Sequence, residues 1–330
     1  MMVCMTRHVR SLLLVLVLAA WCIPSAAVAA DSEEVSEIGD SRIKESSGLT
    51  VSSEHKDLAY TINDAGNAPI VYGIKISTGD VVGTTRVDGG EVKDSESIAI
   101  DGEGTMWLAD LGDNDEERDD VALYAFPEPG PGDHSVTAKR YPVSYDDGPV
   151  DIEAFLVHPE TGAKFLASKE KKKSGTLFSL PDTLSEGSSN VATDLGKAAP
   201  QDVSDGTFNL DGTEALLRTR ESVHLFDPAS WQETGTVEVP EVEQGESIAM
   251  EPGGTSFLIG SEGKNSPLIR VAYGPDAPQV TPSATPEEDE PSAAPQSDDG
   301  VTVPGWLVIV GGVAAVGALA AVAVWVSRRR

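Results

Sequence analysis

The stretch Glu96-Ser97-Ile98-Ala99-Ile100 decides the fold, because it returns almost unchanged as Glu246-Ser247-Ile248-Ala249-Met250. A turn and a second apolar segment follow each copy, which is the pattern of two antiparallel strands. Weaker copies begin at Glu45, Glu153 and Ser204. The copies follow one another at intervals of roughly 40–60 residues, the length of one four-stranded propeller blade.

Short runs rich in Val, Ile, Thr and aromatic residues fill each interval, separated by Gly, Asp, Asn and Pro, as expected for β-strands and turns. The first two intervals hold four runs each: Gly48–Val51, Leu58–Ile62, Ile70–Ile76 and Val81–Val87, then Ile98–Ile100, Met106–Ala109, Val121–Phe126 and Ala138–Val143. The fifth interval holds only three runs, and the residues from Val35 to Ile43 can supply its outer strand. That pairing would join the two ends of the ring and remove an open sheet edge.

The sequence therefore predicts an all-β fold, a five-bladed β-propeller over residues 31–276. A six-bladed propeller is the alternative, if a further blade lies in the irregular region from Leu180 to Gln201. A Greek-key sandwich is disfavoured because it would not produce this repeat.

The N-terminal residues 1–30 have the pattern of a signal peptide. Arg7 and Arg10 precede an apolar run, and Ala27-Val28-Ala29 provides the small residues before a cleavage site. The only cysteines, Cys4 and Cys22, lie in this segment, so the mature chain has no thiol for catalysis or metal binding. We therefore expect the domain that follows to be exported.

The C-terminal part has the pattern of a stalk and an anchor. Residues 277–302 are rich in Pro, Ser and acidic residues, which is typical of a disordered, extended stalk. Residues 303–326 carry no charge and are long enough for a transmembrane helix, and the basic tail at 327–330 is expected on the cytoplasmic side. We expect a single-pass protein of the cell membrane, with its N-terminal domain on the bacterial surface.

The charge of the chain limits its partners. It has 54 acidic against 24 basic residues and a formal net charge of −30. Nucleic-acid binding is excluded because phosphate contacts need clustered Lys and Arg. Apart from the membrane around the helix, the candidate partners are cations and a protein, glycan or small-molecule ligand that the sequence does not identify.

The repeated acidic position predicts a metal site. The first strand of every propeller blade lines the central channel, so equivalent residues of these strands form a ring. Carboxylates that converge there repel one another unless they are protonated, hydrated or held by a cation. Oxygen ligands of this kind suit Ca²⁺. The alternative is that these side chains only form hydrogen bonds with the nearby backbone. The predicted metal ligands are Ser47, Glu96, Glu153, Ser204, Asp205 and Glu246.

The second strands of the repeats end near the same mouth and bring polar residues to it. Asp and Asn in Gly-rich loops suit turns first, and metal binding or polar recognition second. Two of these residues are cations that could hold a phosphate or a carboxylate, or pair with neighbouring glutamates. The predicted mouth residues are Asn63, Asp64, Asp110, Asp113, Asn114, Lys169, Arg220 and Glu262.

The order hydroxyl, Glu, Glu, hydroxyl, Glu around five repeats resembles the calcium-activated apyrase (soluble nucleotidase) family. That resemblance implies a five-bladed propeller with one Ca²⁺ in its channel, and the matching positions are Ser47, Glu96, Glu153, Ser204 and Glu246. The chain departs from that family's Asp-Asp-Arg-Thr-Gly turn, because residues 63–67 lack the arginine. Its Ser-Gly-Leu, Asn-Asp and Gly-Asp-Asn motifs also resemble uncharacterised secreted β-propellers of actinobacteria.

Two functions agree with these features. The first is a surface-displayed binding or scaffold module with Ca²⁺ in its channel. The second is a Ca²⁺-dependent extracellular hydrolase of phosphoesters or nucleotides, in which the metal polarises the substrate. The hydrolase needs cationic phosphate anchors, and only Lys169 and Arg220 are candidates at the mouth, so the binding module is favoured.

Overall fold

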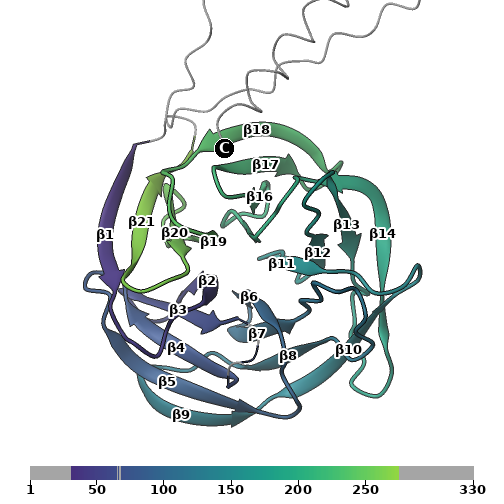
Figure 1. The fold of residues 1–330 in the computed structure, drawn as a ribbon, viewed down its shortest axis with the longest axis horizontal. Coiled ribbons are helices and arrows are strands. Elements are labelled where there is room, and N and C mark those ends of the chain that lie inside the picture. Colours follow the sequence, from purple (N-terminus) through teal and green to yellow (C-terminus); the bar gives the residue numbers. More distant parts are fainter. Residues whose placement is uncertain (1–30, 65, 67, 275–330) are drawn as a thin grey trace, which may run out of the picture. The chain divides into compact units, whose positions relative to one another are not determined.

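The computed structural model describes residues 31–64, 66 and 68–274, and all regular structure in these ranges is β-strand. The all-β prediction is therefore confirmed for the described residues, and the fold is propeller-like (Figure 1). No helix suited to crossing a membrane occurs among these residues. The predicted signal peptide at 1–30, the predicted stalk at 277–302, the predicted helix at 303–326 and the basic tail at 327–330 lie outside them.

Two sheets contain four strands each, and seven of their eight strands come from the end of the domain. One contains β15 (Asp205–Phe208), β16 (Ala215–Arg218), β17 (Ser222–Asp227) and β18 (Gln232–Glu238). The other contains β19 (Gly245–Met250), β20 (Ser256–Ser261), β21 (Ser266–Ala272) and β1 (Ser32–Ile38). The pairing of β1 with β21 confirms that the N-terminal residues complete the last sheet, although the strand ends at Ile38 rather than Ile43.

The first sheet has one strand more than predicted. It contains β2 (Ser46–Val51), β3 (Leu58–Asn63), β4 (Ile70–Lys75), β5 (Val81–Asp88) and β9 (Gly132–Thr137). Strand β9 runs parallel to β5 and comes from the middle of the next repeat. Its residues are mostly exposed and polar, so no apolar run marked it in the sequence.

The remaining eight strands form one hydrogen-bonded sheet from two repeats. The first half contains β6 (Ser95–Ile100), β7 (Thr105–Asp110), β8 (Ala122–Pro127) and β10 (Lys139–Tyr145). The second half contains β11 (Ile152–Val157), β12 (Lys164–Ser168), β13 (Gly175–Ser179) and β14 (Asn190–Ala199). Strands β10 and β14 join the halves through a short parallel pairing. The irregular region from Leu180 to Gln201 thus contributes the single strand β14.

Of the strands that open the repeats, β2, β6, β11 and β19 are labelled around the centre in Figure 1. Strands β2, β6, β11, β15 and β19 contact one another in that order, and β19 contacts β2. Five apolar clusters of described residues fill the spaces between neighbouring groups of strands. Burial of both faces explains the nearly continuous apolar runs, such as β3, in which every residue is buried.

The inner strands share a local irregularity that matters for the site. In β6, β11 and β19 the ladder to the next strand shifts register at Glu96, Glu153 and Glu246 respectively. A residue at such a shift lies outside the regular pairing, and bulges of this kind redirect a side chain. The repeated glutamate of the sequence is therefore placed at the same backbone irregularity in three strands.

Candidate metal centre at the mouth of the ring

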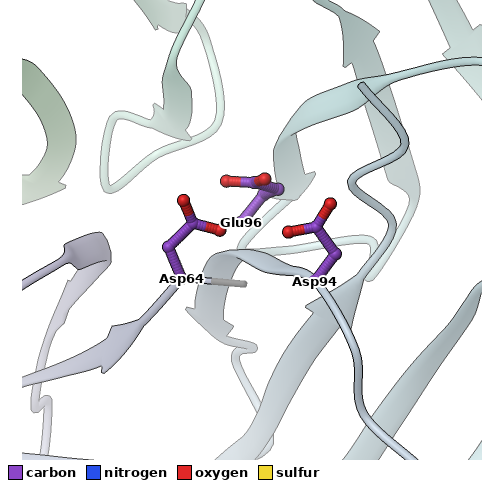
Figure 2. Close-up of side chains that lie close together, drawn as sticks. All are labelled: Asp64, Asp94 and Glu96. Carbon is purple, nitrogen blue, oxygen red and sulfur yellow. The ribbon is translucent and has the colours of Figure 1, made fainter. Parts of the chain in front are cut away.

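Three carboxylates from two neighbouring repeats meet at one mouth of the ring. Asp64 follows β3, Asp94 directly precedes β6, and Glu96 belongs to β6 (Figure 2). One oxygen atom from each of the three lies within 4.8 Å of the others. Glu96 is buried, and the two aspartates are half-buried. This carboxylate cluster can hold a metal ion, because hard oxygen ligands at such distances suit a divalent cation.

The loops that carry the cluster are held by the last residues of the second strands. The Asn63 Oδ1 atom accepts from the N–H groups of Lys44 at 3.1 Å and Glu45 at 3.3 Å. The Asp110 Oδ1 atom accepts from the N–H groups of Lys93 at 3.1 Å and Asp94 at 2.8 Å. Both predicted mouth residues thus bond the backbone before an inner strand, which is the turn role expected of Asx side chains.

Gly112 provides the space that the cluster needs. A Cβ atom at this position would lie 2.5 Å from Oε1 of Glu96 and 2.7 Å from Cγ of Asp94. Both distances are far below a van der Waals contact, so any larger residue would displace the two carboxylates. The N–H group of Gly112 also donates to the carbonyl oxygen of Asp94 at 3.3 Å. Gly112 therefore leaves the room that the two carboxylate side chains occupy.

The carboxylates of the cluster repel one another when they are ionised. Burial raises the pKa of Glu96 well above its ordinary value, and the charges of Glu153, Asp64 and Asp94 add to the increase. Burial, together with the hydrogen bond and charge of Asp64, raises the pKa of Asp94 to about 7. The buried Oδ1 atom of Asp94 has no hydrogen-bond partner among the described residues. A cation at the cluster would offset this repulsion.

The other predicted ring residues on β2 and β11 lie beside the cluster. The Ser47 hydroxyl donates to the carbonyl oxygen of Glu96 at 2.8 Å and lies 3.3 Å from Oε2 of the same residue. Glu153 accepts a hydrogen bond of 2.8 Å from Nζ of Lys169, one of the predicted mouth cations. Glu153 is thus paired with a lysine, whereas Ser47 lies within hydrogen-bond distance of the Glu96 carboxylate.

The predicted metal ligands of the fourth repeat form hydrogen bonds with other residues of the protein. The Ser204 hydroxyl donates to the carbonyl oxygen of Gly245 at 3.0 Å. Asp205 is almost fully buried and accepts from the Ser97 hydroxyl at 2.8 Å and the Ile248 N–H group at 2.9 Å. In β15, Asp205 lies opposite Arg218 in the regular strand register with β16, and no register shift occurs at this residue. Asp205 does not belong to the carboxylate cluster.

The remaining mouth residues have separate roles. Asp113 accepts from the N–H groups of Glu117 at 3.0 Å and Arg118 at 2.8 Å, and so shapes its own loop. Asn114 is exposed and lies 3.5 Å from Nζ of Lys171. Burial, followed by the charge of Glu246, raises the pKa of Glu262 to about 7. None of these three residues belongs to the cluster.

A second feature of the mouth is a pocket of about 400 Å³ next to Glu246. We call it the basic pocket, because three of its lining residues are cations. It is lined by Lys169, Lys171 and Arg220, together with Asp202, Ser204 and Glu246. Lys169 lies between the pocket and the glutamates of the inner strands. Burial lowers the pKa of this lysine, but the charges of Glu153, Glu246 and Glu96 raise it by more.

Asp94 is the cluster residue that sequence reasoning did not single out. It lies two positions before Glu96, outside the repeated Glu-Ser-Ile-Ala stretch. The signal that could have found it is its position in the repeat, because Asp94 corresponds to Glu45 when Ser95 and Ser46 are aligned by their pairing with the next strand.

Comparisons with known proteins identify no family. No protein-family model matches the sequence, and no curated protein matches it. Among solved structures, the fold is similar to that of a gluconolactonase from Xanthomonas campestris, with a TM-score of 0.46 and 12% sequence identity. The match covers 74% of this chain and 87% of that chain.

Proposed function

We propose that the chain is a five-bladed β-propeller that acts as a cell-surface binding module and holds Ca²⁺ at the carboxylate cluster. Support for five blades comes from the five inner strands, which contact one another in a closed cycle. The region from Leu180 to Gln201 adds one strand to an existing group rather than a separate sheet. The proposed location on the cell surface rests on the signal peptide and the apolar segment at 303–326.

The observation that carries the calcium proposal is the convergence of Asp64, Asp94 and Glu96 within 4.8 Å. All three donors are carboxylate oxygens, and Ca²⁺ takes 6–8 oxygen ligands in a flexible geometry. Water and the ligand of the module would complete the coordination, as they do at many exposed calcium sites. Zn²⁺ is disfavoured because it prefers nitrogen and sulfur ligands, which the cluster does not supply.

The ion pair of Lys169 with Glu153 favours a binding function over hydrolysis. This lysine was one of two phosphate anchors that a hydrolase of phosphoesters or nucleotides would need, and it is paired with Glu153 at 2.8 Å. An ion pair in a half-buried position stabilises the inner strands and lowers the charge available to a substrate. A Ca²⁺-dependent release of phosphate from nucleoside triphosphates, lost in Arg220→Gln, would reverse this preference.

Calorimetric titration of Ca²⁺ into the purified chain, stripped of divalent cations with a chelator, tests the proposed function. We expect one site, with affinity lost in Glu96→Gln and Asp94→Asn. Glu186→Gln removes an exposed carboxylate that pairs with Lys139 at 3.6 Å, and serves as the matched control. Equal binding by wild type and both cluster variants would refute the site.

A further inference from the structure

We infer that the basic pocket binds a small polar anion through a phosphate or carboxylate group, with Lys171 and Arg220 as its anchors. The inference deepens the proposed binding function, since it names the chemical class of the ligand. It concerns the pocket of about 400 Å³ beside Glu246 rather than the carboxylate cluster itself.

The distribution of charge points to an anion. The chain has 24 basic residues among 330, yet four of them fall in the stretch Lys169-Glu170-Lys171-Lys172-Lys173 after β12. Arg220 reaches the same pocket from the loop after β16. The net charge of −30 repels anions at long range, so recognition of an anion requires a local gathering of cations. Three cations line this pocket, beside the carboxylates of Asp202 and Glu246.

Two of the three pocket cations are available for a ligand. Lys171 and Arg220 are exposed, and neither forms an ion pair with a carboxylate in the part of the chain that the structure describes. Lys169 is paired with Glu153, and Lys173 is paired with Glu170 at 3.2 Å. Lys171 and Arg220, which form no ion pair among the described residues, thus line the pocket, while the nearby Lys169 and Lys173 are paired with glutamates.

The walls of the pocket are held in place by backbone contacts. Gln201 Nε2 donates to the carbonyl oxygen of Lys171 at 2.8 Å, and the Asp202 N–H group donates to that of Glu170 at 3.1 Å. The fully buried guanidinium of Arg218 lies directly against Gly245, another lining residue. The pocket is thus formed before a ligand arrives, which reduces the entropic cost of binding.

The size and lining of the pocket limit the ligand further. A volume of about 400 Å³ lies within the range of roughly 300–1,000 Å³ typical of small-molecule sites. Its lining residues are charged, hydroxyl-bearing or glycine, so an apolar ligand would gain little there. Arginine and lysine together favour an oxyanion, because a guanidinium and an ammonium group both donate charge-assisted hydrogen bonds to it.

Calorimetric titration of the full chain with inorganic phosphate and with succinate, at low ionic strength and in the presence of chelator, tests the inference. We expect wild type to bind one or both anions. Lys171→Gln and Arg220→Gln should each weaken binding by about tenfold, the value of one charge-assisted hydrogen bond. Lys197→Gln and Arg86→Gln remove exposed cations elsewhere and should bind as wild type does. Preference for phosphate or for succinate identifies the group that the ligand carries.

Absence of binding to wild type, or equal binding by wild type and the two pocket variants, would overturn the inference. Binding that appears only with Ca²⁺ and does not depend on Lys171 or Arg220 would overturn it as well. A parallel Ca²⁺ titration keeps the two proposals separate. Loss of anion binding with intact Ca²⁺ binding affects only the basic pocket, whereas anion binding without any Ca²⁺ binding affects only the metal centre.

Discussion

The Nζ atom of Lys169 donates a hydrogen bond of 2.8 Å to Oε1 of Glu153, at the point where the basic pocket meets the ring. Both side chains are largely removed from solvent, with exposed fractions of 19% for the lysine and 3% for the glutamate. A buried pair of this kind is costly to break, because removal of one partner leaves the other charge without compensation.

Lys169→Met should therefore destabilise the protein by about 3 kcal/mol at pH 10, where the glutamate of the wild type is ionised. Burial raises the pKa of Glu153 to about 8 even with the lysine present, and loss of the lysine raises it further, so this glutamate is neutral in both proteins at pH 5 and the loss there should be smaller. Urea unfolding at the two pH values measures the difference. Lys173→Met breaks an exposed pair and should cost less than about 1 kcal/mol at either pH. A pH-independent loss for Lys169→Met would contradict the interpretation.

Gly112→Ala should abolish the response of the protein to Ca²⁺. The added methyl group would overlap Oε1 of Glu96 and the carboxyl group of Asp94, so both ligands must move. We expect a stability loss of about 1–3 kcal/mol from overpacking, in addition to the loss of metal affinity. Gly187→Ala is the matched control, because a Cβ atom there meets nothing within 4 Å. Wild-type calcium affinity in Gly112→Ala would show that the cluster does not form the site.

Calcium affinity should rise with pH. The pKa of Asp94 is raised to about 7, mainly by burial, and Ca²⁺ binds only the ionised carboxylate. One such group predicts affinity about tenfold weaker at pH 6 than at pH 8, with release of protons on binding. Titrations in two buffers of different ionisation enthalpy measure both quantities. Equal affinity at the two pH values, without proton release, would contradict this prediction.

The free energy of unfolding of the metal-free protein should fall as the pH rises, whereas its calcium affinity should increase. A carboxyl group with a folded pKa above its unfolded value stabilises the fold below the unfolded pKa, and this contribution is lost as pH rises through the folded pKa. For Asp94 the window extends from its ordinary value of 3.8 to about 7. With chelator present, the free energy of unfolding should therefore fall between pH 4 and pH 8. A rise over this window in Asp94→Asn relative to wild type would support the assignment, and identical profiles would refute it.

The location of the protein gives a separate prediction. A chain that ends at residue 276 lacks the stalk and the apolar segment at 303–326, and should appear in the medium of the producing cells. The full chain should remain in the membrane fraction and be accessible to protease added outside. Recovery of the full chain in the medium would argue against anchoring by this segment.

The sequence predicted the repeated part of the fold well and the details of the site less well. The strand positions and the pairing of the N-terminal strand followed from apolar runs and from the need to close the ring. Strand β9 was missed because its pairing with β5 joins two neighbouring repeats and does not depend on an apolar pattern in its own mostly exposed residues.

Within the site, the repeat identified Glu96 but not the aspartate that completes the cluster. The meeting of Asp94 and Asp64 depends on two loops from neighbouring repeats, a contact that no local pattern reveals. The sequence also treated Asp205 as equivalent to the glutamates. Its strand has no register shift at that residue, so the side chain bonds Ser97 and the Ile248 N–H group instead.

Thermal unfolding with added Ca²⁺, with Mg²⁺ and with chelator tests the central claim most directly, with Glu96→Gln measured alongside wild type. Ligand at about 100 times its dissociation constant stabilises a protein by about 2.7 kcal/mol, which corresponds to a rise in Tm of roughly 5–10 °C for a domain of this size. We predict such a rise for wild type with Ca²⁺, a smaller one with Mg²⁺, and none for Glu96→Gln. An unchanged Tm in wild type, or an equal rise in the variant, would contradict the calcium site.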